Sequence, residues 1–176
     1  MPQIEQQPNG GLVRVDFTLN GTPVGVDIRP DMPMLELLRE ACGITSVKDG
    51  CAPEGSCGAC TVLMDGRAVV SCSQLATRVA GRSVLTQEGL PAADRERWAD
   101  AFVASGASQC GFCSPGIVMK AEALLGRNPD PSRGEIAHAL AGNLCRCTGY
   151  RQIVDAIRDA AAAMRTKEAV REKVSA

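Results

Sequence analysis

Eight of the nine cysteines in this 176-residue chain fall into two groups of four, and no other feature constrains the fold as strongly. The first group spans a glycine-rich loop and the hairpin that follows it. The second consists of two tight pairs separated by helix-length sequence. Four thiols that converge typically bind a metal centre, so the fold must bring each group together. The first group is Cys51, Cys57, Cys60 and Cys72, and the second is Cys110, Cys113, Cys145 and Cys147.

The composition is that of an ordinary globular protein, with 45% apolar and 22% charged residues. A formal net charge of −1 gives no basic surface for nucleic acid or an anionic membrane, and no apolar run approaches the length of a membrane span. The N-terminal residues show no export signal. We therefore expect a cytoplasmic protein whose cysteines bind metal rather than form disulfides.

The first half of the chain predicts an α+β unit. Apolar and polar residues alternate on both sides of Asn20-Gly21, and Asp65-Gly66 supplies a second hairpin turn. An apolar stripe at helical spacing lies between the two hairpins. This order of elements favours a small sheet packed on one helix. The predicted elements are strands at 12–20 and 24–28, a helix over 31–42, a cysteine loop over 45–56, a hairpin over 61–72 and a strand at 83–86.

The second half predicts helices only. Ser114 and Thr148 are predicted helix caps, and Ser132 with Glu135 fits a capping box. Four helices joined by short links indicate a bundle. Their apolar stripes fall within residues 98–105, 114–125, 132–140 and 148–164.

The first cysteine group resembles the ligand spacing of a plant-type [2Fe–2S] ferredoxin, which is Cys-x4-Cys-x2-Cys with a distant fourth cysteine. Here five residues separate Cys51 from Cys57, and two separate Cys57 from Cys60. Glycines at 50, 55 and 58 suit a loop that wraps closely and points backbone N–H groups at sulfur. A four-cysteine zinc knot is the alternative.

The second group combines Cys-x2-Cys with Cys-x-Cys, and the latter is less typical of structural zinc. Cys113 and Cys147 each precede a predicted helix start, so two helix N-termini would face the centre. A [2Fe–2S] centre and a zinc tetrathiolate carry the same charge, and this placement does not distinguish them. We expect Cys42 to be a buried thiol without metal, and His138, the one histidine, to be a surface or packing residue.

Several of these segments resemble the small iron–sulfur subunit of the molybdenum hydroxylases, the xanthine dehydrogenase and aldehyde oxidoreductase family. The resemblance covers roughly residues 11–164 and is carried by eight cysteines in the family's order. The matching motifs are Gly50-Cys51, Cys57-Gly-Ala-Cys60-Thr-Val, Cys72, Gln109-Cys-Gly-Phe-Cys-Ser-Pro-Gly116 and Gly142-Asn-Leu-Cys-Arg-Cys-Thr-Gly-Tyr150.

The resemblance implies a β-grasp ferredoxin domain followed by a four-helix bundle, each with one [2Fe–2S] cluster. It also implies a large partner subunit that holds a molybdopterin cofactor, and a subunit with FAD or another acceptor. Gln109 and Cys147 would contact the pterin, and this chain would contribute no catalytic residue. Together with the changes of composition and periodicity along the chain, this predicts a disordered lead at 1–10, a ferredoxin-like domain at 11–86, a linker at 87–93, the helical domain at 94–164 and a charged tail at 165–176.

The chain departs from the family in the five-residue gap after Cys51, which contains Pro53 and puts the local loop path in question because proline has no N–H donor. Two other functions stay open. One is a free-standing two-cluster electron carrier without a partner, and the other is a zinc-stapled interaction module. The sequence specifies neither a substrate nor a reduction potential.

Overall fold

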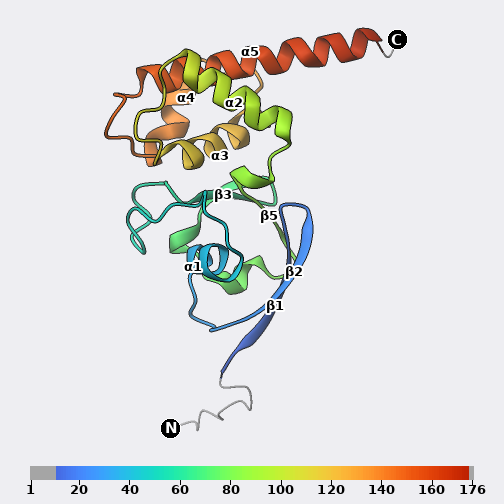
Figure 1. Cartoon of the computed structure of the whole chain (residues 1–176), viewed down its shortest axis with the longest axis vertical. Helices are drawn as coiled ribbons and strands as arrows, with labels where there is room; N and C mark the ends of the chain where they lie inside the picture. Colours follow the sequence, from blue (N-terminus) through green and yellow to red (C-terminus); the bar gives the residue numbers. More distant parts are fainter. Residues whose placement is uncertain (1–10, 175–176) are drawn as a thin grey trace.

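The computed structural model describes residues 11–174, so the predicted disordered lead at 1–10 lies outside the described residues. A five-stranded sheet with α1 beside it forms one part of the molecule, and α2 to α5 form the other (Figure 1). The α+β class is confirmed. The strands are β1 (Val13–Leu19), β2 (Thr22–Ile28), β3 (Thr61–Met64), β4 (Arg67–Val70) and β5 (Ser83–Leu85); the α-helices are α1 (Met34–Glu36), α2 (Ala92–Ala104), α3 (Ser114–Leu125), α4 (Arg133–Ala139) and α5 (Arg151–Val174).

The sheet is mixed, with the strand order β2-β1-β5-β3-β4. Strands β1 and β5 pair in parallel, while β1–β2, β3–β4 and β3–β5 pair antiparallel. Both predicted hairpins are confirmed. Asn20 and Asp65 have φ values of 52° and 49°, and the glycine after each is also left-handed, as a two-residue hairpin turn requires.

Strand β3 is buried on both faces, which explains why its sequence is continuously apolar. Val62 and Met64 join the core formed with α1, whereas Leu63 points the other way into the core of the helices. Side chains alternate between the faces of a strand, so one short strand packs against both parts of the molecule. The two parts are therefore joined by apolar packing as well as by the connecting chain.

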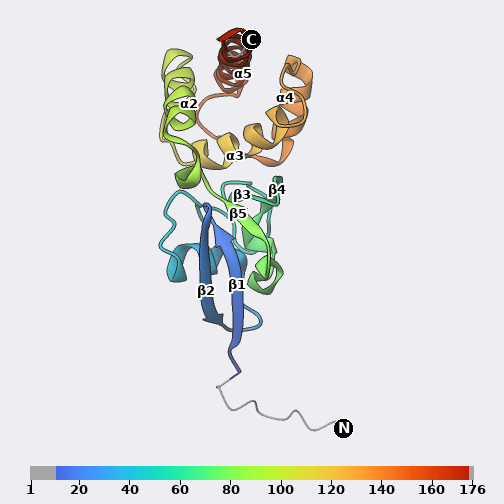
Figure 2. The same ribbon diagram turned by 90° about the vertical axis from the view of Figure 1, so that its right-hand side faces the viewer.

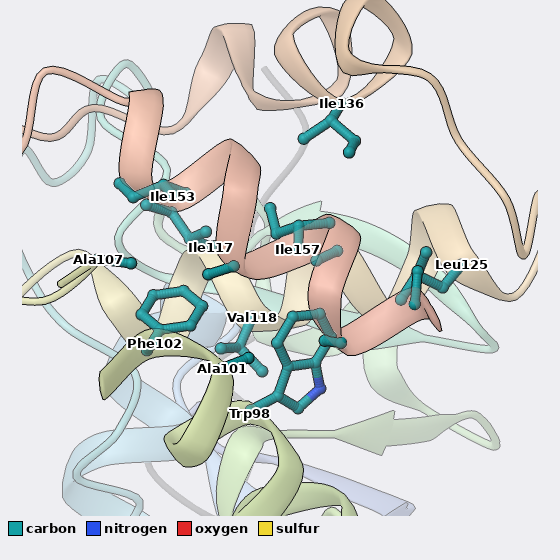
Figure 3. Packing of buried hydrophobic residues seen from close by; sticks show 14 of the residues in the cluster. Trp98, Ala101, Phe102, Ala107, Ile117, Val118, Leu125, Ile136, Ile153 and Ile157 are labelled. Carbon is teal, nitrogen blue, oxygen red and sulfur yellow. The ribbon is translucent and has the colours of Figure 1, made fainter. Parts of the chain in front are cut away.

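The helical part is built around Trp98, which is 1% exposed. Its ring meets Phe102 edge to face, with centroids 6.3 Å apart. Ile117 of α3 and Ile153 and Ile157 of α5 complete the centre of this core (Figure 3). Viewed from the side, α2 and α4 lie on either side of α5, with α3 nearest the sheet (Figure 2). None of the helices described between residues 11 and 174 has the length and apolarity to span a membrane.

Two predicted helix starts are wrong in detail. Ser114 is already within α3, whose N-cap is Cys113, and its hydroxyl lies 3.4 Å from that of Ser108. Helix α5 begins at Arg151 rather than after a cap at Thr148, because Gly149 and Tyr150 both have left-handed φ values. The capping box of Ser132 and Glu135 is confirmed.

Helix α5 is also longer than predicted. It continues to Val174, through most of the segment at 165–176 that was predicted as a charged tail. In Figure 1 its C-terminal half extends past the other helices.

Candidate paired-thiol metal centres

The first cysteine group is assembled by the loop after α1 and by the end of the β3–β4 hairpin. Cys57 donates its backbone N–H to Sγ of Cys51 at 3.3 Å, and Cys72 donates its N–H to Sγ of Cys60 at 3.5 Å. The thiols of each of these two pairs are also in contact. Cys72 was predicted on the returning strand, but β4 ends at Val70 and Cys72 lies in a 3-10 turn over Ser71–Ser73. That turn brings Cys72 back toward Cys60.

The second group is assembled by the segment before α3 and the segment before α5. Sγ of Cys110 lies 3.6 Å from Sγ of Cys147, and the Cys113 thiol contacts that of Cys145. The hydroxyl of Thr148 lies 3.2 Å from Sγ of Cys145. All eight predicted ligands therefore lie where the sequence analysis grouped them, as four close pairs.

Pairs of thiols fit a binuclear iron centre better than a single metal ion. Two thiolates on one tetrahedral metal, with metal–sulfur bonds of about 2.3 Å, lie about 3.8 Å apart, and the Cys110–Cys147 distance is close to that. A [2Fe–2S] cluster takes two protein ligands on each iron, so two pairs per group suit it.

Burial separates the two groups. Cys60 and Cys72 are 1% and 3% exposed, whereas Cys110 and Cys147 are exposed at the surface. Cys51 and Cys57 of the first group are half-buried, so only Cys110 and Cys147 among the eight thiols are exposed, and they form an open edge of the second group. Gln109 lies at the open edge, where its Nε2 donates to the backbone carbonyl of Cys147 at 3.1 Å.

The protonation of the thiols follows from these surroundings. Burial raises the pKa of Cys72 and that of Cys113 to about 12. The hydroxyl of Ser56, together with the Cys57 thiol, lowers the pKa of Cys51 to about 7. A cysteine binds metal as the thiolate, so loading each centre with iron must release protons from the buried thiols.

The motif over residues 142–150 also joins the two centres, which its sequence did not predict. The backbone N–H of Leu144 donates to the carbonyl of Cys57 at 2.8 Å. The buried amide of Asn143 donates to the Gly58 carbonyl at 3.0 Å and to Oγ1 of Thr61 at 3.3 Å. The Tyr150 hydroxyl accepts from the N–H of Cys145 and donates to the Asn143 carbonyl. Asn143, Leu144 and Tyr150 stand within a quoted cysteine motif, but only the fold shows what they contact.

The two glycines at this junction are needed for space. A Cβ on Gly116 would lie 2.4 Å from the carbonyl oxygen of Gly58. A Cβ on Gly58 would lie 2.2 Å from that of Gly142, and Gly58 also has a φ of 68°. The backbone of helix α3 and the backbone of the loop of the first group therefore approach so closely that no side chain fits between them.

The ninth cysteine and the histidine stand apart from this chemistry. Cys42 ends the helical turn over Leu37–Ala41 and packs, half-buried, against the core of the sheet. Burial raises the pKa of its thiol. His138 is exposed on α4, as expected for a surface residue.

A β-sheet part and a helical part, each with four paired thiols, define an iron–sulfur protein of the electron-transfer class with two [2Fe–2S] centres. Two family models match the chain. A 2Fe-2S iron-sulfur cluster binding domain covers residues 17–90, and a [2Fe-2S] binding domain covers residues 86–158.

Individual relatives narrow the class. The nicotinate dehydrogenase small FeS subunit of Eubacterium barkeri is 44% identical over 83% of this chain and 93% of its own length. The xanthine dehydrogenase iron-sulfur-binding subunit of Escherichia coli O157:H7 is 45% identical over 84% of this chain and 93% of its own length. The chain belongs to the small [2Fe–2S] subunit family of the molybdenum hydroxylases.

Solved structures agree. A chain of quinoline 2-oxidoreductase from Pseudomonas putida 86 superposes with a TM-score of 0.83 at 42% identity, covering 89% of this chain and 98% of that one. The aldehyde oxidoreductase of Desulfovibrio gigas gives a TM-score of 0.82 at 39% identity, and there the match covers 17% of the longer chain. The likeness therefore extends from the cysteine spacing to the arrangement of both parts.

Proposed function

We propose that this chain takes electrons from a molybdopterin site in a large partner subunit and passes them, one at a time, through its two [2Fe–2S] centres. The order is the Cys110–Cys147 centre first and the Cys51–Cys72 centre second. From there the electrons leave to a flavin subunit or another acceptor. The chain is thus the non-catalytic electron-transfer subunit of an oxidoreductase, with substrate oxidation in the partner.

The observation that carries this order is the difference in exposure between the two groups. Cys110 and Cys147 are exposed, so a partner surface can approach the second group directly. Gln109 is also exposed there and holds the Cys147 carbonyl. These residues suit the expected role of Gln109 and Cys147 as contacts of the pterin.

The connection between the centres supports transfer within the chain. From Sγ of Cys57, covalent bonds lead to its carbonyl, across the hydrogen bond to the Leu144 N–H, and on to Cys145. Cys57 and Cys145 are proposed ligands of different clusters. Each [2Fe–2S] centre accepts one electron, so the two in series divide a two-electron oxidation into single steps.

The finer fold assignment belongs to the same proposal. We infer a β-grasp ferredoxin domain over residues 11–86 and a four-helix domain over 94–164, joined by a linker at 87–93. The division is supported by the family matches at 17–90 and 86–158 and by the two separate apolar cores.

Native purification tests the function. A tagged chain expressed in its own host is expected to bring down a large subunit with molybdenum, in addition to its own iron and acid-labile sulfide. Recovery of the iron-loaded chain without partner or molybdenum would favour the free-standing carrier. Recovery of zinc without sulfide would favour the interaction module.

A further inference from the structure

Phe112 touches both cysteine groups. It lies between Cys110 and Cys113 in the sequence, which are two proposed ligands of the second centre. Its ring reaches the loop of the first group and lies against Gly50, the residue before Cys51. Phe112 therefore belongs to the segment of the second group, while its ring lies against the loop of the first.

The space at Gly50 shows how close this contact is. A Cβ placed there would lie 3.1 Å from Cε1 of Phe112 and 3.0 Å from Sγ of Cys57. Gly50 does not have a left-handed φ, so its missing side chain provides room rather than backbone freedom. The Phe112 ring and the Cys57 sulfur thus border the same narrow space.

We propose that Phe112 is a positioning residue for electron transfer: its ring holds the two centres at a fixed spacing and keeps water away from the Cys57 side of the first. This inference rests on the proposed function. The ring is 44% exposed, so its outer face meets solvent or a partner while its inner face covers the junction. A rigid aromatic ring suits such a role because it covers a large apolar area with few rotatable bonds.

The proposal predicts an asymmetric effect on the two reduction potentials. A reduced [2Fe–2S] centre carries one more negative charge than the oxidised centre, and water stabilises that charge. Without the ring, water reaches Cys57, so the potential of the first centre rises. The potential of the second centre should change little, because the ring lies against the loop of the first group.

The experiment is a redox titration followed by electron paramagnetic resonance on the full chain loaded with iron. Phe112→Ala is expected to raise the midpoint potential of the first centre, to leave the second nearly unchanged, and to alter the magnetic interaction between the reduced centres. Phe112→Leu restores bulk without the ring and is expected to shift the same values less. Val103→Ala removes an exposed apolar side chain from α2 and is expected to change nothing.

Two results would overturn the positioning role of Phe112. One is an equal shift of the midpoint potentials of both centres, and the other is no shift of either potential in both the Phe112→Ala and the Phe112→Leu variant. If Phe112→Ala fails to retain iron, Phe112→Leu provides the test. Midpoint potentials and magnetic interaction equal to those of the wild type in Phe112→Leu would contradict the proposal. Absence of two [2Fe–2S] signals from the unmodified chain contradicts the proposed function itself. The two failures are therefore distinguishable.

Discussion

The backbone N–H of Leu144 donates to the carbonyl oxygen of Cys57 at 2.8 Å, although the two residues are far apart in the sequence. Leu144 precedes Cys145, a proposed ligand of the second centre, and Cys57 is a proposed ligand of the first. The side chain of the neighbouring Asn143 holds this contact in place from a buried position. The alignment of the two centres therefore depends on a few polar contacts at the junction.

Replacing Asn143 should loosen the junction. Asn143→Ala removes the bonds to the Gly58 carbonyl and to Thr61 Oγ1. Loss of buried hydrogen-bond partners is expected to cost about 2 kcal/mol and to slow electron transfer between the centres. Denaturant unfolding at matched iron content measures the first effect, and flash reduction measures the second. Asn128→Ala is the control, because it removes two exposed bonds of an asparagine side chain, one donated to Glu135 and one accepted from the Asp130 N–H. Equal losses in both variants would contradict the junction role.

Glycine-to-alanine changes separate steric contact from backbone preference. Gly116→Ala places a Cβ 2.4 Å from a backbone oxygen and is expected to destabilise the chain by about 2 kcal/mol or more. Gly134→Ala lies in α4 with no atom within 4 Å of the added carbon. There the variant should be neutral or stabilising by about 0.5–1 kcal/mol, since alanine favours helix. Thermal unfolding of both variants provides the comparison, and similar destabilisation would refute a close approach at Gly116.

The contact between Glu88 and the backbone of Thr45 and Ser46 should depend on pH. Burial opposes its ionisation, but the N–H groups of Ser46 and Thr45 hold the pKa of its carboxyl below the usual value. A lowered pKa in the folded state means that the carboxylate stabilises the fold above about pH 4.3, the ordinary value of glutamate. This stabilisation is lost as the pH falls through the folded-state pKa.

The matching variant is Glu88→Gln, which does not ionise. At neutral pH it should be less stable than the wild type by about 1 kcal/mol, because charged hydrogen bonds are replaced by neutral ones at a partly exposed site. The difference should shrink as the pH is lowered through the acid range. Unfolding midpoints measured across pH 3–7 check this, and a constant difference would count against it.

The local features of the fold were predictable because short-range chemistry determines them. Asn20-Gly21 and Asp65-Gly66 form turns from their own backbone preferences, and Ser132 forms its capping box with a residue three positions away. The start of α5 was misplaced because the left-handed Tyr150 carries no sequence signal as clear as a glycine.

The cysteine grouping was also predictable, since ligand spacing repeats within a family, and the structure brings the members of each group together. The pairing within the second group was not, because Cys110 lies against Cys147 and Cys113 against Cys145 rather than each against its neighbour in the sequence. The junction was not predictable either. Asn143 and Gly58 meet across 85 positions, and no spacing rule relates them. Phe112 stands in the sequence only as a residue between two predicted ligands, and its contact with Gly50 is visible only in the fold.

The central claim is that the chain holds two [2Fe–2S] clusters on eight cysteines. Iron and acid-labile sulfide analysis of Cys110→Ser and Cys42→Ser, beside the unmodified chain, tests it most directly. The unmodified chain and Cys42→Ser should each hold two irons per centre and show two signals on reduction, while Cys110→Ser should lose the cluster of the second group. Full iron retention in Cys110→Ser, or zinc without sulfide in the unmodified chain, would contradict the account.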